Sequence, residues 1–197
     1  MRILRPPLIS LDIETYSPYG FPEQKEDPIV SLTLAISETI RIQSGLVVIS
    51  ILFPPERESD LLVRTREILS TLPEGTLTTY YGSRFDLPYL EFRGNMYGVN
   101  LREIKTRLAH LDAYDIARSF PFASYSQKRV EKELGIKRRV VGINGSGYHC
   151  AYERFQSRGD LGCLLYNIED SVGVLVLLSH LFSMKGSGLI LRQDREA

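Results

Sequence analysis

Three short acidic segments lie far apart in this chain of 197 residues, and their residue types are those that bind metal ions. The segments are Asp12-Ile13-Glu14, Phe85-Asp86 and Tyr166-Asn167-Ile168-Glu169-Asp170. Carboxylates held close together repel one another unless a proton or a cation lies between them. Their hard oxygen atoms favour Mg²⁺ or Mn²⁺. If the fold brings the three segments together, they could hold divalent cations.

Two of these acids, Asp12 and Glu14, end an apolar and β-branched run, Pro7–Thr15, that predicts a buried strand. Side chains alternate between the two faces of a strand, so this pair lies on one side of it. An acid-x-acid triplet also arises by chance in a chain with 24 acidic residues. The pair is therefore informative only together with the other two segments.

The second acidic segment belongs to Thr76–Leu90, which predicts a strand, a turn at Gly82 and the start of a helix. Asp86 lies at the expected N-cap of that helix, shortly before Pro88. Asp is a favoured N-cap for reasons unrelated to catalysis. Capping and metal binding both fit Asp86 in isolation, and only the other segments favour metal binding.

The third segment lies in Asp160–Ser183, where apolar residues recur at helical spacing and predict the clearest helix of the chain. Tyr166 and Asp170 are four residues apart, so a phenol and a carboxylate share one helical face. We expect Asn167 and Glu169 to point elsewhere. A hydrogen bond between Tyr166 and Asp170 across one turn is a purely structural alternative.

In order and separation, the three segments resemble the exonuclease motifs of the DEDDy group within the DnaQ-like, RNase H-like superfamily. The residues that carry this likeness are Asp-Ile-Glu-Thr, Tyr-Gly-Ser-Arg-Phe-Asp-Leu-Pro-Tyr-Leu and Tyr-Asn-Ile-Glu-Asp-Ser. The chain looks most like the proofreading exonuclease domain of family B DNA polymerases. His110–Asp115 resembles a His-hydrophobic-Asp strand of those domains, and the likeness covers about residues 7–182.

The resemblance implies that Asp12, Glu14, Asp86 and Asp170 bind two divalent cations, Mg²⁺ or Mn²⁺, and that Tyr166 positions the attacking water. Two such cations activate water and stabilise the leaving oxygen when a phosphodiester is hydrolysed. A phenol with a pKa of about 10 does not readily ionise. Tyr166 is therefore expected to orient the water through its hydroxyl group rather than act as a base.

Residues beside the acids are expected to contact the substrate, namely Thr15, Tyr81 and Phe85. The resembled polymerases usually carry Asn where this chain has Tyr81, a departure that concerns substrate contacts rather than metal binding. Tyr80, Tyr81 and Phe85 could stack on terminal bases, because aromatic stacking tolerates every base. Burial in the core is the alternative for each ring.

Two loops could also approach a nucleic acid. The basic, glycine-rich stretch 137–147 could contact phosphates or form a solvated turn. It lacks the strand–turn–helix setting of a nucleotide-binding fingerprint, so we expect no nucleotide cofactor. In the loop Tyr16–Pro28, Tyr19 and Phe21 could either border the bound strand or pack against the core.

The order of expected elements predicts an α/β fold, an RNase H-like mixed β-sheet of about five strands flanked by helices. Further strands are expected at Ile29–Ile36 and Gly45–Phe53, and a helix at Arg57–Leu72. We expect a single domain over residues 1–197, with the motifs in about 7–182 and a C-terminal tail at about 185–197.

Composition limits the other classes of function. The net charge is zero and the pI about 6.8, which is no strong basic footprint for nucleic acid. We see no apolar run of about 18 residues and no signal-peptide core, so we expect no membrane association and a cytoplasmic location. Two cysteines, Cys150 and Cys163, suit reduced thiols. The three histidines are expected to be structural or on the surface.

We therefore expect a free-standing, metal-dependent 3′→5′ exonuclease that acts on single-stranded DNA ends, and on RNA as a second substrate, without a polymerase domain. Any role in DNA repair or proofreading would be in trans, and the sequence names no protein partner. Two alternatives stay open. One is an RNA-trimming exoribonuclease of the same superfamily, and the other is a non-catalytic nucleic-acid-binding subunit.

Overall fold

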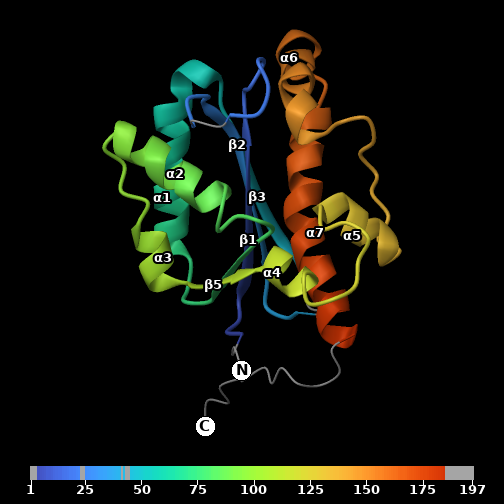
Figure 1. Cartoon of the computed structure of the whole chain (residues 1–197). Helices are drawn as coiled ribbons and strands as arrows, with labels where there is room; N and C mark the ends of the chain where they lie inside the picture. The colour runs from blue at the N-terminus through green and yellow to red at the C-terminus, as the bar shows by residue number, and fades with distance from the viewer. Residues whose placement is uncertain (1–3, 23–24, 41, 43–44, 185–197) are drawn as a thin grey trace.

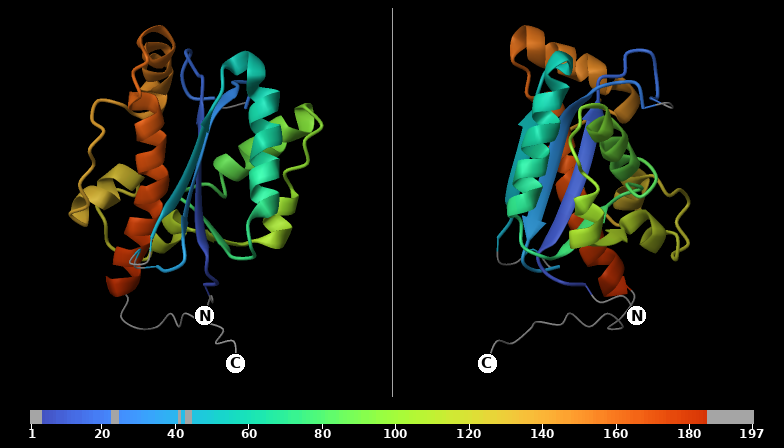
Figure 2. Two further views of the ribbon diagram at one scale, coloured as in Figure 1. Left: turned by 180° about the vertical axis from the view of Figure 1, so that it is seen from behind. Right: turned by 90° about the vertical axis from the view of Figure 1, so that its left-hand side faces the viewer.

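The computed structural model describes residues 4–22, 25–40, 42 and 45–184, and within them a central β-sheet lies between two groups of helices (Figure 1). The expected tail at 185–197 lies outside the described residues. The two further views show that the helices cover both faces of the sheet (Figure 2). The predicted α/β fold with a mixed sheet flanked by helices is confirmed.

In the described part of the chain the sheet has five strands in the spatial order β3-β2-β1-β4-β5. The first three pair antiparallel, whereas β1, β4 and β5 run parallel. The bounds are β1 Leu8–Thr15, β2 Ile29–Ser37, β3 Val47–Leu52, β4 Thr76–Thr79 and β5 Ala109–Asp112. The strand that carries the first acidic segment is therefore the middle one.

Helices α1, α2 and α3 cover one face of the sheet, and α5, α6 and α7 lie on the other, where α4 packs against α7 (Figures 1 and 2). A 3₁₀ turn precedes α1, and another precedes α6. The bounds are η1 Pro55–Arg57, α1 Glu58–Thr71, α2 Asp86–Met96, α3 Glu103–Arg107, α4 Ala113–Ala117, α5 Gln127–Glu133, η2 Gly145–Gly147, α6 Tyr148–Arg158 and α7 Gly162–Met184.

Both faces of β1 are packed, and its alternation separates apolar from polar residues. Ile9, Leu11 and Ile13 join the core formed with α1 and α2. The alternate positions turn toward α7, and there Asp12 and Glu14 follow Ser10. The predicted placement of the two acids on one side of a strand is confirmed, and α7 is the element that covers them.

A buried ion pair joins the two helices on the opposite face. Glu58 begins α1 and is fully buried, and it pairs with Arg93 of α2 through both carboxylate oxygens. The backbone N–H of Ile29 donates to the same carboxylate at 2.8 Å, and Arg93 donates to the backbone oxygen of Glu26 at 2.8 Å. This network fixes α2, whose first residue is Asp86, relative to α1 and to the start of β2.

Helix α7 is long and apolar enough, by length and composition alone, to cross a membrane, contrary to our expectation that no segment would qualify. Half of its most apolar window is buried inside the protein. Its leucine and valine residues pack against the sheet and α4, and it carries the polar side chains of Asn167 and Asp170. A helix in the core of a protein has the same composition, and that is its place here.

Candidate active site

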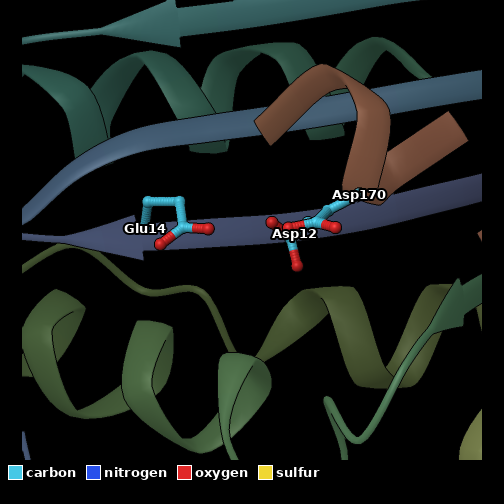
Figure 3. A group of neighbouring side chains, drawn as sticks. All are labelled: Asp12, Glu14 and Asp170. Carbon is cyan, nitrogen blue, oxygen red and sulfur yellow. The ribbon is translucent and has the colours of Figure 1, made fainter. Parts of the chain in front are cut away.

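Three of the predicted metal ligands meet at the centre of the fold. One carboxylate oxygen from each of Asp12, Glu14 and Asp170 lies within 4.8 Å of the other two. Figure 3 shows the carboxylates of Asp12, on β1, and Asp170, on α7, side by side, with Glu14 further along the same strand. Residues separated by up to 158 positions thus form one cluster.

The fourth predicted ligand, Asp86, reaches β1 where the sheet leaves room for it. Strand β4 pairs with β1 only as far as Ser10 and Thr78. Further along β1, the backbone N–H of Ile13 donates to Asp86 Oδ1 at 3.1 Å. Asp86 is the first residue of α2 rather than its N-cap, which is Phe85, so the predicted capping position was wrong by one residue. Its carboxylate binds the strand instead of capping the helix.

The cluster holds more negative charge than buried carboxylates tolerate alone. Burial raises the pKa of Asp12 well above its usual range, and the charges of Asp86, Asp170 and Glu14 raise it further. Burial and the charges of Asp170 and Asp86 do the same to the pKa of Glu14. Burial raises the pKa of Asp86 to about 7, although backbone N–H groups oppose the shift. A bound cation would relieve this repulsion.

These pKa shifts predict that the metal-free protein loses stability as the pH rises. Unfolded Asp has a pKa of about 3.9, whereas folded Asp86 has a pKa of about 7. Between these values the folded state binds more protons than the unfolded state, so the free energy of unfolding falls with increasing pH. Thermal unfolding in chelator should give a smaller decrease between about pH 5.5 and about pH 8 for Asp86→Asn than for wild type. Identical pH profiles would contradict the prediction.

One residue of α7 that we expected to point elsewhere binds the cluster. Asn167 is fully buried and donates from Nδ2 to Asp12 Oδ2 at 2.5 Å. Its carbonyl oxygen accepts hydrogen bonds from the hydroxyl groups of Ser31 and Thr33 on β2. The carboxylate of Asp12 can only accept a hydrogen bond, so the amide nitrogen of Asn167 must face it and the amide oxygen must face Ser31 and Thr33. The prediction was wrong for this residue, which holds Asp12 in place.

The other residue expected to point away does so. Glu169 accepts hydrogen bonds from the backbone N–H groups of Arg139 and Val140 at 2.5 and 3.1 Å. It therefore holds the 137–147 stretch against α7 instead of facing the carboxylate cluster.

Tyr166 is buried beside the carboxylates, with 4% of its surface exposed. Burial, together with the charges of Asp170, Glu14 and Asp12, raises the pKa of its phenol far above the usual value, so the group stays protonated. The ammonium group of Lys128 lies 4.3 Å from the centre of the ring, and the ring of Tyr148 lies 6.0 Å away. A neutral phenol in this place can orient a water molecule, the role that the resemblance implies for Tyr166 and that stays a prediction.

The basic stretch 137–147 turns one of its cations inward. Arg138 forms ion pairs with the carboxylates of Glu131 and Asp170. Lys128 donates to the backbone oxygen of Ile143 at 2.8 Å, which ties the same stretch to α5. We expected this stretch either to contact phosphates or to form a solvated turn. Arg138 does neither, because it neutralises part of the carboxylate cluster. Its neighbours Lys137 and Arg139 are exposed and stay candidates for phosphate contacts.

The predicted substrate-contact residues have different environments. Thr15 is buried, and its hydroxyl group lies 2.7 Å from that of Ser17. Phe85 is partly buried and packs on Tyr89, while the ring of Phe21 lies 5.3 Å from it. Phe21 is 69% exposed, so an aromatic surface reaches from the core to solvent there. Tyr19, at 100% exposure, makes no core contact.

Asp112, within the sequence segment His110–Asp115, has a positioning role that we had not assigned. Its buried carboxylate accepts hydrogen bonds from the backbone N–H groups of Tyr81, Ser83 and Tyr114, at 2.7, 3.0 and 3.1 Å. It thereby fixes the turn that leads from β4 into α2. Because Asp86 is the first residue of α2, Asp112 helps to position Asp86 indirectly, through this turn.

Comparison with known proteins assigns the chain to a family. A family model described as the RNase_H superfamily matches residues 9–182. The chain belongs to the RNase H superfamily. Nucleases of the RNase H superfamily use divalent metal ions, and the cluster of Asp12, Glu14 and Asp170 could bind one. Membership therefore supports a nuclease, a hydrolase that acts on nucleic acid.

A solved structure shares the fold of this RNase H superfamily member. It is the family B DNA polymerase from the hyperthermophilic archaeon Pyrobaculum calidifontis, with a TM-score of 0.70 and 22% sequence identity. The match covers 92% of this chain and 25% of the polymerase, so the chain spans about a quarter of that protein's length. No curated protein sequence matches the chain significantly.

Proposed function

We propose that this protein is a metal-dependent 3′→5′ exonuclease that removes nucleotides from single-stranded DNA, with RNA as a further substrate. The observation that carries the proposal is the convergence of carboxylates from β1, α2 and α7 beside the buried phenol of Tyr166. The elements supply these groups in the order of the exonuclease motifs that the sequence resembles. That order supports attack at the 3′ end.

Asp12, Glu14, Asp86 and Asp170 would hold the two cations, Mg²⁺ or Mn²⁺. All four offer carboxylate oxygens, the ligands that hard divalent cations prefer. Burial, and after it the charges of neighbouring acids, raises the pKa values of the first three, and a bound cation would favour their charged forms. When bound, two cations supply an activated water and neutralise charge at the leaving oxygen.

Hydrolysis joins a water oxygen to the terminal phosphorus and breaks its bond to the 3′ oxygen of the preceding nucleotide. The water gives up a proton and the 3′ oxygen gains one, so the products are a nucleoside 5′-monophosphate and a shortened strand with a 3′ hydroxyl. The protein's own residues orient these groups. Asn167 holds Asp12, and the protonated Tyr166 can hydrogen-bond the attacking water.

Digestion of 5′-labelled single-stranded DNA and RNA of the same sequence tests the proposal. The reactions should contain Mg²⁺, Mn²⁺ or a chelator. We expect ladders that shorten from the 3′ end only when metal is present. A faster ladder on RNA would favour the exoribonuclease alternative, because recognition would then include the 2′ hydroxyl. Tight binding with no shortening in either metal would favour the non-catalytic subunit.

Tyr166→Phe should lower kcat by about a hundredfold and leave KM nearly unchanged. The substitution removes the hydroxyl that is proposed to orient the water, and a misplacement of about 1 Å at a reacting centre can cost about 10² in rate. Steady-state rates of 3′ shortening over a range of substrate concentrations measure kcat and KM separately.

Tyr152→Phe is the matched control for Tyr166→Phe. Tyr152 is also a buried tyrosine of the neighbouring α6, but its hydroxyl donates to the backbone oxygen of Phe53. It should keep the wild-type rate. Equal rates for all three proteins would assign Tyr166 a structural role only.

A further inference from the structure

Tyr81 has a backbone conformation that a tyrosine rarely adopts. Its φ is 65°, in the left-handed region that glycine and asparagine tolerate better than a bulky residue. Hydrogen bonds fix this conformation: its N–H donates to Asp112, and its carbonyl oxygen accepts from the N–H groups of Arg84 and Phe85. Burial of the ring does not require this backbone conformation, because Tyr81 is 44% exposed. The fold thus keeps an exposed aromatic ring at a position where a smaller residue would relieve strain.

The ring of Tyr81 forms one wall of an open cavity of about 610 Å³. Three further tyrosines, Tyr80, Tyr114 and Tyr125, line the same cavity. Tyr81 and Tyr114 meet edge to face, with their ring centres 4.9 Å apart. Polar groups complete the lining, namely the side chains of Ser124, Ser126 and Gln127. Flat aromatic walls combined with a few hydrogen-bonding groups suit a planar, polar ring such as a nucleobase.

A cation stands beside the aromatic walls. The guanidinium of Arg84 lies 5.4 Å from the centre of the Tyr81 ring and 5.2 Å from that of Tyr114. It pairs with Asp115 at 2.9 Å, and its side chain is 42% exposed. An arginine has five N–H donors, so it can also reach a phosphate at the mouth of the cavity. Base stacking and a phosphate contact would then act on the same nucleotide.

The cavity adjoins the carboxylate cluster through one side chain. Gln127 lines the cavity and donates from Nε2 to the backbone oxygen of Asp170 at 2.9 Å. The turn that holds Tyr81 also leads directly into α2 and Asp86. A strand whose 3′ end lies at the cluster can therefore reach this cavity.

We infer that the cavity of Tyr81, Tyr114 and Tyr125 is a binding site for one base of the single strand, upstream of the bond that is cut. This inference rests on the proposed exonuclease. The site holds the strand by stacking and reads no sequence, since every base has an aromatic face. The strained backbone at Tyr81 is retained because it presents the ring to that base.

The test scans a 5′-labelled DNA strand with one abasic position at a time, counted from the 3′ end. In wild type, one internal abasic position should raise KM for the first cleavage by about tenfold, the effect expected from losing one stacked base. In Tyr81→Asn, the intact strand should show a similar increase in KM, and the abasic position should have no further effect. Tyr81→Phe keeps the ring and should retain the wild-type pattern.

Stability separates this result from misfolding. Asparagine suits a left-handed backbone, so Tyr81→Asn should raise the midpoint of thermal unfolding while it weakens strand binding. Tyr97→Asn is the matched control, because Tyr97 is equally exposed, at 45%, but has a φ of −102° at the end of α2. It should leave both KM and the abasic pattern unchanged.

The outcomes distinguish the cavity from the exonuclease. Cleavage by wild type without any sensitive internal position, or an unchanged KM in Tyr81→Asn, would overturn the cavity proposal and leave the exonuclease intact. If wild type cleaves nothing, binding of a fluorescent oligonucleotide in chelator decides. Binding that is lost in Tyr81→Asn and kept in Tyr97→Asn would support the cavity without the exonuclease. Equal binding by wild type, Tyr81→Asn and Tyr97→Asn, or no binding by any of them, would overturn the proposal that the cavity binds a base.

Discussion

Asp12→Asn is expected to slow strand shortening by about a thousandfold or more, because it removes a charged ligand from the centre of the cluster. Loss of metal stabilisation of the reacting phosphate is worth several kcal/mol, and each 1.4 kcal/mol, roughly, is tenfold in rate. The same change removes a carboxylate whose pKa is raised by burial and by three neighbouring acids. In chelator, the variant should therefore unfold at a higher temperature than wild type at neutral pH.

The measurements are the rate of 3′ shortening and the thermal midpoint with and without Mn²⁺. Wild type should gain stability when Mn²⁺ is added, and Asp12→Asn should gain much less. Asp60→Asn is the matched control, since Asp60 is an exposed acid on α1 that pairs with Arg57. It should behave as wild type in both assays. Full activity of Asp12→Asn would refute the metal-ligand assignment.

Glu58→Ala is expected to lower the free energy of unfolding by about 3–5 kcal/mol, the cost of leaving a buried charge without its partner. Arg93 would lose both of its bonds to the carboxylate, and the N–H of Ile29 would lose its acceptor. The pair is almost fully buried, with side-chain exposures of 6% for Arg93 and 0% for Glu58.

Denaturant unfolding of Glu58→Ala, Arg93→Met and a double variant, Glu58→Leu with Arg93→Met, measures this effect. The double variant should be more stable than either single variant, because apolar side chains of similar size can replace a buried ion pair. Asp60→Asn breaks an exposed pair and should change stability by less than about 1 kcal/mol. If Glu58→Ala lowers the free energy of unfolding by less than about 1 kcal/mol, the buried ion pair does not contribute to stability as proposed.

Local patterns in the sequence were sufficient to predict the elements that carry the site. The alternation along β1 put Asp12 and Glu14 on one side, and the apolar spacing of α7 predicted its helix almost to the residue. These features depend on neighbours within a few positions. The family likeness added which acids belong together, and the structure brings Asp12, Glu14 and Asp170 to one point.

Contacts set by tertiary packing could not be predicted in this way. Asn167 faces Asp12 because α7 lies on β1 and β2 at a particular rotation, which its own sequence does not fix. Asp86 binds Ile13 because β4 stops short beside β1. Arg138 lies in a segment whose composition indicates a solvated loop, yet two buried acids draw it inward. A fully buried asparagine or a partly buried arginine must find partners, but only the fold shows which ones.

The wide spacing of the site along the chain has a consequence for synthesis. A ribosome makes Asp12, Glu14 and Asp86 before α7, which supplies Asp170, Tyr166 and Asn167 about 80 residues after Asp86. Until then the nascent chain lacks a complete metal site, even if its sheet and first helices have formed. The order of the elements thus delays assembly of the carboxylate cluster until α7 has been made.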